Sequence, residues 1–303
     1  MSKNRKIVVL GSTGYVGGKF LNLFEEKGID CVGLSRRDVN YEDRDTLISF
    51  LKDARPTFLI NAAGFTGKPN VDACEIYKSD TLMGNAVLPG IVRSACEAIN
   101  LPWGHVSSGC IFTGRNDKGD GFNESDPANF SFRTDNCSFY SGTKALGEEV
   151  LSGAECFIWR LRIPFNNEAI PRNYLYKLLN YNSLLEAENS ISHLEEFVSA
   201  CWECWSRRLP FGVYNVTNPG TVTTREVVKL MQEESRRRKE LGLEDPFGKE
   251  YTFFEDEDDF MAKAAKTPRS NCVLDTTKLE QAGIKLMPVR EAIQKSLQEW
   301  TTI

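Results

Sequence analysis

The sequence has 303 residues, is 41% hydrophobic and 26% charged, and carries a formal net charge of −5 with an isoelectric point near 5.4. These values are ordinary for a soluble globular protein with one large α/β unit or two modest domains. The acidic balance argues against a nucleic-acid partner, and the longest basic run, SRRRK at 235–239, predicts a solvated helix end. No apolar run reaches the roughly 18 residues of a membrane span, so no membrane partner is expected.

Nine cysteines are scattered along the chain without paired spacing. An odd number without a framework pattern predicts free thiols in a reducing compartment. The single CxxC, at 201–204, lies in an amphipathic helical pattern and lacks the second pair or nearby histidines of a zinc site, so no metal is expected. Because the chain enters a strand pattern at once without a leader, we expect a cytoplasmic protein.

Apolar runs alternate with helical patterns over the first half of the chain. The runs are KIVVL, DCVGL, TFLINAAG, LPWGHVSSGCIF and CFIWRLRIP. Such alternation predicts an α/β fold, a Rossmann-type doubly wound parallel sheet covered on both faces, with right-handed crossovers.

The alternation loosens after Pro164. Helical patterns at 171–182, 193–209 and 289–300 surround a short strand pattern, GVYNVTN. We therefore expect a smaller C-terminal lobe, partly interleaved with the first. An acidic patch, FFEDEDDF, predicts a solvated loop or a helix start.

The segment GSTGYVGG places Gly11, Gly14 and Gly17 between the first strand and its helix. Glycines at this spacing allow a tight turn and bring backbone N–H groups to a pyrophosphate at the helix N-terminus. Because the motif opens a βαβ unit, it predicts a dinucleotide site rather than a turn without a ligand.

The second strand pattern is followed by Ser35, Arg36 and Arg37. An Asp or Glu there would bind the ribose diol of NAD, whereas a guanidinium matches a 2′-phosphate. The sequence therefore predicts NADPH as cofactor, with Arg36 as the contact; simple exposure explains Arg37 equally well, and tolerance of NADH stays open. We expect residues 1–164 to form the NADP(H)-binding domain and 165–303 to form mainly the substrate-binding lobe.

Tyr140 and Lys144 lie four residues apart at the start of a helical pattern, FYSGTKALGEEV, and so share one face. A lysine ammonium stabilises a phenolate, so we expect a lowered pKa at Tyr140 and proton exchange with a carbonyl or hydroxyl. Following the fourth strand, with Ser108 upstream, this Y-x-x-x-K motif indicates a reductase.

These motifs, together with NAAGFTGKPNVDACE, SGCIF, PRNYLYKL, YNVTNPG and PRSN, resemble the extended short-chain dehydrogenase/reductase family over nearly the whole length. Within it the chain is similar to the dTDP-4-dehydrorhamnose reductase branch. The similarity is greatest to the eukaryotic bifunctional UDP-4-keto-6-deoxyglucose 3,5-epimerase/4-reductases, which make UDP-L-rhamnose.

The resemblance implies roles for individual residues. Those implied to bind the cofactor are Gly11, Thr13, Gly14, Tyr15 and Val16 at its diphosphate, Ala62, Ala63 and Gly64 along its path, Asn85 close by, and Tyr140 and Lys144. Those implied for the substrate are Ser108 in the catalytic triad with Tyr140 and Lys144, Asn173 at the sugar, and Arg269 and Asn271 near the nucleotide diphosphate.

Cys110 stands two residues after Ser108, where a strand would aim both side chains the same way. A C4 ketone acidifies the protons on C3 and C5, and inverting those centres needs acid/base groups on both ring faces. A thiol, with a reference pKa of about 8.5, can serve. The resemblance implies Lys177 as the partner, where GDP-fucose synthases use a histidine. The alternatives are a buried filler at 110 and an exposed helical lysine at 177.

The expected function is therefore a bifunctional 3,5-epimerase/4-reductase that converts UDP-4-dehydro-6-deoxy-D-glucose to UDP-L-rhamnose with NADPH. One alternative is a 4-ketoreductase that acts only on a pre-epimerised nucleotide sugar. The other is a non-catalytic regulatory subunit resembling the methionine adenosyltransferase β subunit. The sequence leaves open UDP against dTDP, and whether the protein forms a homodimer.

Overall fold

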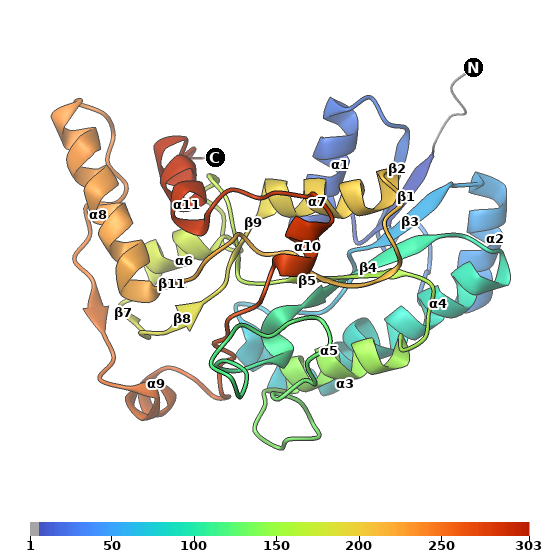
Figure 1. Cartoon of the computed structure of the whole chain (residues 1–303), viewed down its shortest axis with the longest axis horizontal. Coiled ribbons are helices and arrows are strands. Elements are labelled where there is room, and N and C mark those ends of the chain that lie inside the picture. Colours follow the sequence, from blue (N-terminus) through green and yellow to red (C-terminus); the bar gives the residue numbers. More distant parts are fainter. Residues whose placement is uncertain (1–5, 303) are drawn as a thin grey trace.

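The computed structural model describes residues 6–302 and is built around one six-stranded parallel sheet (Figure 1). Its strands, in spatial order, are β10 (Gly212–Asn215), β5 (Phe157–Leu161), β4 (Trp103–Ser108), β3 (Phe58–Asn61), β1 (Ile7–Leu10) and β2 (Cys31–Leu34). The strand order reverses at β1 and β3, and ligands of such sheets bind at this point, beyond the carboxyl ends of the strands. The predicted Rossmann-type fold class is confirmed.

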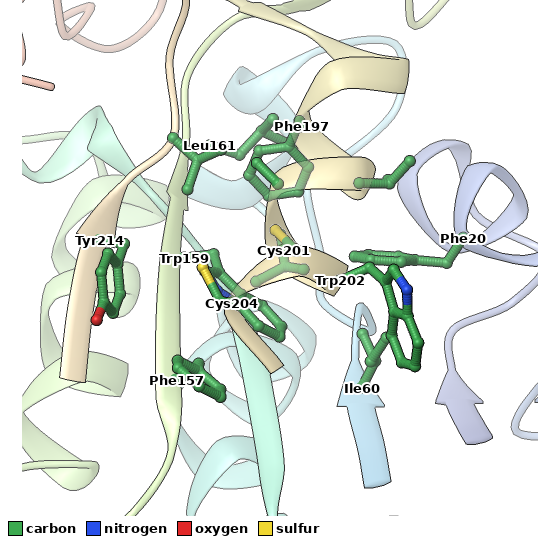
Figure 2. Close-up of a cluster of buried hydrophobic side chains, with 14 of the residues drawn as sticks. Phe20, Ile60, Phe157, Trp159, Leu161, Phe197, Cys201, Trp202, Cys204 and Tyr214 are labelled. Atoms are coloured by element: carbon green, nitrogen blue, oxygen red, sulfur yellow. The ribbon is translucent and has the colours of Figure 1, made fainter. Parts of the chain in front are cut away.

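Helices cover both faces of the sheet (Figure 1). One face carries α1 (Tyr15–Glu26) and α7 (Leu194–Ser206); the other carries α2 (Arg44–Ala54), α4 (Leu88–Ala98) and α5 (Phe139–Val150). Phe20 and Trp202 meet over the first face, and Cys201 and Cys204 of the CxxC are fully buried there beneath α7 (Figure 2). These two thiols are core residues.

A second lobe follows β5, at the left of Figure 1. Its helices are α6 (Tyr174–Asn180), α8 (Thr224–Glu240) and α11 (Val289–Gln298). Its short strands are β6 (Pro164–Phe165), β7 (Ser183–Leu184), β8 (Glu188–Asn189), β9 (Ser192–His193), β11 (Val222–Thr223) and β12 (Thr252–Phe253). Phe165, Leu175, Met231, Phe247 and Trp300 share a separate apolar core. The chain returns to the first layer with α7 and β10, so the lobes are interleaved.

Short elements complete the architecture. They are the 3₁₀ helices η1 (Val71–Glu75) and η3 (Gly109–Ile111), the π-helical turn η2 (Met83–Val87), and α3 (Lys78–Leu82), α9 (Glu257–Lys263) and α10 (Thr277–Gln281). The acidic patch forms the start of α9, as expected. Within the described residues, no helix combines the length and apolarity needed to cross a bilayer.

One local expectation was wrong, and a second, that of a solvated basic helix end, holds for Arg236 and Lys239 but not for Arg238. The strand β4 ends at Ser108, because the Ser108 hydroxyl accepts the backbone N–H of Cys110 at 3.2 Å and caps η3. Cys110 therefore lies in a 3₁₀ helix, and strand alternation does not set its direction. In the basic run, Arg238 is buried, because Glu234 and the carbonyl of Leu297 bind its guanidinium.

Candidate active site

The glycine-rich loop leads from β1 into α1. Gly11 has φ +74°, and a Cβ there would lie 2.7 Å from the Cα of Ala63; a Cβ at Gly17 would lie 2.2 Å from the Gly11 carbonyl oxygen. Gly14 precedes the helix and no side chain caps it. The first-turn N–H groups are thus available to an anion, and the cradle fits a dinucleotide pyrophosphate.

Tyr15 connects this loop to the second lobe. Its hydroxyl donates to the Asn166 side-chain oxygen at 2.9 Å, and burial raises its pKa, with Glu195 and Glu168 acting in the same direction. On the same helix, Lys19 pairs with Glu168 and Glu195 at 2.5 and 2.9 Å. The loop that would hold the cofactor is therefore fixed to the lobe that would hold the substrate.

A cavity of about 590 Å³ lies between the carboxyl ends of the strands and the second lobe. Residues 14–16 and 62–64 line it on the sheet side. Five cationic side chains also line it: Lys144, Arg162, Arg172, Lys177 and Arg269. None of its described lining residues is Asp or Glu, although the whole chain is acidic. Such a cavity favours an anionic ligand.

Ser108, Tyr140 and Lys144 all line this cavity. The helix α5 carries Tyr140 in its first turn and Lys144 one turn later. Its start is held by two contacts: the Ser138 hydroxyl accepts the Ser141 N–H at 3.2 Å, and the Glu75 carboxylate accepts the Phe139 N–H at 2.7 Å. The structure thus brings the three expected reductase residues together.

The expected lowering of the Tyr140 pKa is not what the protein environment produces. Burial raises that pKa, and the nearby Cys110 thiol adds to the effect, while the Ser108 hydroxyl opposes it. Burial also lowers the pKa of Lys144, which weakens the ammonium as a stabiliser of phenolate. The environment therefore holds Tyr140 in its protonated form.

Cys110 is 5% exposed and lines the cavity beside Ser108. Burial raises the pKa of its thiol; the Ser108 hydroxyl, then Arg162 and Lys144, oppose that rise. The thiol is therefore buried from bulk solvent, yet it borders the space that a ligand would fill.

Lys177 projects from α6 into the same cavity and is only partly exposed, which overturns the alternative of a surface lysine. Burial lowers its pKa, and the positive charges of Arg172 and Arg269 lower it further. Cys110 from the first lobe and Lys177 from the second therefore border one space, and burial favours the neutral form of both.

Arg269 and Asn271 line the cavity as well. The Arg269 guanidinium binds both carboxylate oxygens of Asp72, at 2.7 and 2.9 Å, and lies 5.5 Å from the centre of the Phe260 ring. This arrangement presents a held cation beside an aromatic face, which suits a nucleotide.

Other expected residues do not border the cavity. Arg36 has a side chain 61% exposed and pairs with Glu42 at 3.1 Å. Asn85 is fully buried and clamps the backbone of Phe65, accepting its N–H and donating to its carbonyl. Asn173 is also fully buried and caps α6, so its side chain serves the backbone. Gly11 and Thr13 lie outside the lining too.

Sequence reasoning missed Glu75 and Arg162. Glu75 is the last residue of the motif NAAGFTGKPNVDACE, but the sequence suggested no role for it. Its contact with the N–H of Phe139 joins residues 64 positions apart. Arg162 follows β5 and lines the cavity, yet its neighbours come from residues 27 and 108 positions further along. The one sequence signal that could have drawn attention to Arg162 is that a second arginine follows closely in an otherwise apolar strand pattern, CFIWRLRIP.

A family model described as the RmlD substrate binding domain matches residues 5–302. The chain belongs to this family. It is similar to a bifunctional dTDP-4-dehydrorhamnose 3,5-epimerase/dTDP-4-dehydrorhamnose reductase of Arabidopsis thaliana, at 32% identity over 97% of this chain and 93% of that protein. The predicted family is thereby confirmed, and it is a family of reductases with epimerase/reductase members.

Two solved structures share the fold. The L780 UDP-rhamnose synthase of Acanthamoeba polyphaga mimivirus superposes with a TM-score of 0.86 at 22% identity, over 97% of this chain and 99% of that one. A dTDP-4-dehydrorhamnose reductase of Bacillus anthracis, in complex with NADP, gives a TM-score of 0.77 at 15% identity, over 98% of each chain.

Proposed function

We propose that the protein is a bifunctional 3,5-epimerase/4-reductase that converts UDP-4-dehydro-6-deoxy-D-glucose to UDP-L-rhamnose with NADPH. The single observation that carries this is the joint placement of Cys110 and Lys177 with Ser108, Tyr140 and Lys144 around one cavity. The curated Arabidopsis relative, named for both an epimerase and a reductase, supports the same pairing of activities.

The glycine cradle, with Ala62, Ala63 and Gly64, would hold NADPH, and Arg36 would meet its 2′-phosphate after leaving Glu42. The NADP of the Bacillus anthracis structure supports this choice of cofactor. When bound, NADPH supplies hydride to C4 of the sugar. Arg269, with Asn271, would hold the nucleotide diphosphate in the part of the cavity that Arg172 and Lys177 also line.

In the reduction, Ser108 donates a hydrogen bond to O4 and Tyr140 protonates that oxygen as the alkoxide forms. The raised pKa of Tyr140 keeps the phenol protonated until charge develops on O4. Lys144 lies one helical turn away in the same cavity, so its ammonium form would stabilise the phenolate left behind.

In the epimerisation, one of Cys110 and Lys177 removes a proton from C3 or C5 and the other returns a proton to the opposite face. The C–H electron pair passes to O4 as an enolate, which Ser108 and Tyr140 stabilise by hydrogen bonds. A ketone at C4 serves both centres, so one cavity can carry both inversions before reduction removes it.

The deciding experiment incubates the purified protein with UDP-4-keto-6-deoxyglucose in D₂O, with and without NADPH. We expect deuterium at C3 and C5 without NADPH, and UDP-L-rhamnose with it, by NMR and mass spectrometry. Reduction of a pre-epimerised ketosugar alone, without deuterium uptake, would leave a 4-ketoreductase. Absence of both reactions would favour the regulatory-subunit alternative.

A further inference from the structure

Among the residues that the structure describes, Arg162 is a buried cation without a counter-ion. Its residue is 6% exposed, and it lines the cavity. Its guanidinium donates to the Asn189 side-chain oxygen at 2.6 Å and to the carbonyl of Ser270, and both acceptors are neutral. Its Nε–H is buried and has no partner in the described structure.

Arg160, two residues earlier and within β5, shows how a buried arginine is usually neutralised. It is 4% exposed and binds the carboxylate of Glu148 through two nitrogens, at 2.8 to 3.2 Å. A buried cation left uncompensated costs several kcal/mol. The chain neutralises Arg160 and, within residues 6–302, leaves Arg162 without an ion pair. A charge retained at that cost indicates a role in the chemistry of the cavity.

The sheet register places Arg162 beside the segment that carries Ser108 and Cys110. Ser108 pairs with Leu161 at the ends of β4 and β5, and the residues that follow these two strands are Gly109 and Arg162. A Cβ at Gly109 would lie 3.4 Å from Cδ of Arg162. The positive charge of Arg162 opposes the burial-driven rise of the Cys110 pKa.

Other groups also face Cys110. The Ser108 and Ser141 hydroxyls and Lys144 favour its thiolate. The negative charge of that thiolate in turn raises the pKa of its neighbours Tyr140, Cys74 and Cys137. A third thiol, Cys272, contacts Arg162, but it donates to the Gly109 carbonyl at 3.3 Å and does not line the cavity. Cys110 therefore both lines the cavity and interacts electrostatically with Arg162.

We propose that Arg162 is the counter-ion of the Cys110 thiolate, a positioning residue that serves epimerisation more than reduction. The inference rests on the function proposed above. When Cys110 donates its proton, the S–H bond breaks, the enolate electron pair forms the new C–H bond, and sulfur keeps a negative charge. When Cys110 accepts a proton, the thiolate pair forms S–H and the C–H pair passes to O4. Arg162 stabilises the charge on sulfur in both directions.

The test uses the full chain with Arg162→Gln, which keeps a donor for Asn189 but removes the charge, and Arg162→Lys, which keeps the charge. Arg160→Lys is the matched control, since it alters the buried arginine that already has a carboxylate partner. The pH dependence of Cys110 alkylation by iodoacetamide is followed by peptide mass spectrometry, with Cys137 as internal reference. This readout needs no substrate, so it stands even if the proposed activity fails.

We expect Arg162→Gln to raise the pH of half-maximal Cys110 alkylation by about one unit or more, while Arg162→Lys and Arg160→Lys shift it little. In the Arg162→Gln variant, the rate of deuterium uptake at C3 and C5 should fall by a factor at least ten times larger than the factor by which the rate of reduction of a pre-epimerised ketosugar falls. Asn189→Asp, which gives Arg162 a carboxylate without removing it, should act in the same direction and serves if Arg162→Gln does not fold.

Two results would overturn the inference. One is an unchanged Cys110 alkylation profile in a folded Arg162→Gln or Asn189→Asp protein. The other is a parallel fall of both half-reactions with weaker binding of UDP, which would assign Arg162 to the substrate diphosphate instead.

Discussion

The carboxylate of Glu75 accepts the backbone N–H of Phe139, the residue immediately before Tyr140, at 2.7 Å. The contact joins η1, which carries the Asp72 partner of Arg269, to the first turn of α5, which carries Tyr140. A carboxylate at a helix N-terminus also interacts favourably with the helix dipole. Glu75 therefore fixes where α5 begins and, with it, where the Tyr140 hydroxyl stands.

We expect Glu75→Ala to lower kcat for reduction by about tenfold or more, because small displacements of a catalytic group are costly. Glu75→Gln keeps an acceptor and should retain most of the activity. Steady-state kinetics with a pre-epimerised ketosugar check this, with KM expected to change less than kcat. Equal loss in both variants would point to charge, not position, as the contribution of Glu75.

Cys110→Ser should reduce deuterium uptake at C3 and C5 by about a hundredfold or more, because a hydroxyl replaces the acidic thiol at nearly constant size. NADPH binding should persist, since the cofactor cradle is untouched. Cys137→Ser is the control, because Cys137 is only partly buried and does not line the cavity. Normal uptake in the Cys110 variant would return that residue to a packing role.

Lys177 gives the exchange reaction a pH dependence of defined sign. Its pKa lies below the ordinary value of about 10.5, because burial and two arginines disfavour the ammonium. The neutral amine therefore accumulates as pH rises through that lowered pKa, and the deuterium uptake rate should rise with it. Lys177→Arg, always protonated, should abolish this limb, and Lys229→Arg on the exposed side of α8 should not. A pH profile unchanged in Lys177→Arg would exclude Lys177 as the base.

Arg36→Ala should raise KM for NADPH by about tenfold or more, the value of a charge-assisted hydrogen bond, and leave KM for NADH nearly unchanged. Arg37→Ala provides the comparison, since simple exposure accounts for that side chain equally well. Coenzyme titrations of the reduction measure both constants. An equal effect on NADPH and NADH would place Arg36 away from the 2′-phosphate.

Glu148 and Glu149 are adjacent but differ in what their loss should cost. Glu148 neutralises the buried Arg160, so Glu148→Ala should lower the free energy of unfolding by about 3–5 kcal/mol. Glu149 pairs with the exposed Arg133, and Glu149→Ala should cost about 1 kcal/mol or less. Urea denaturation of both variants measures the difference, and similar losses would mean that Arg160 finds another partner.

Much of the fold and of the candidate site could be predicted from patterns within short stretches of sequence. The glycine loop, the alternating strands and the Tyr140–Lys144 pair each depend on residues close in sequence, so spacing was enough to place them. The expectation for Cys110 used strand alternation, which the hydroxyl of Ser108 ends by capping η3. Cys110 nevertheless lines the same cavity as Ser108, because the 3₁₀ turn keeps the two residues close together.

The parts that could not be predicted depend on contacts between distant segments. Asn85 and Asn173 are amides that a motif assigns to ligands, yet the folded chain uses both for backbone groups. The burial that raises the Tyr140 pKa is likewise a property of the folded chain, in which Cys110, Cys74 and Arg162 come close to it. Arg162 stands out because no carboxylate within residues 6–302 pairs with it, and no pattern along the sequence reveals such an absence.

The return of the chain to the sheet has a consequence for biosynthesis. Until residue 215 has left the ribosome, β5 lacks its neighbour β10, and until α7 has emerged the aromatic face formed by Phe157 and Trp159 stays uncovered. The six-stranded sheet therefore cannot be completed before the chain has been made as far as residue 215, well beyond the end of β5 at Leu161. A nascent chain stalled near residue 164 would present an open strand edge and a bare apolar face, both of which attract chaperones and aggregation partners.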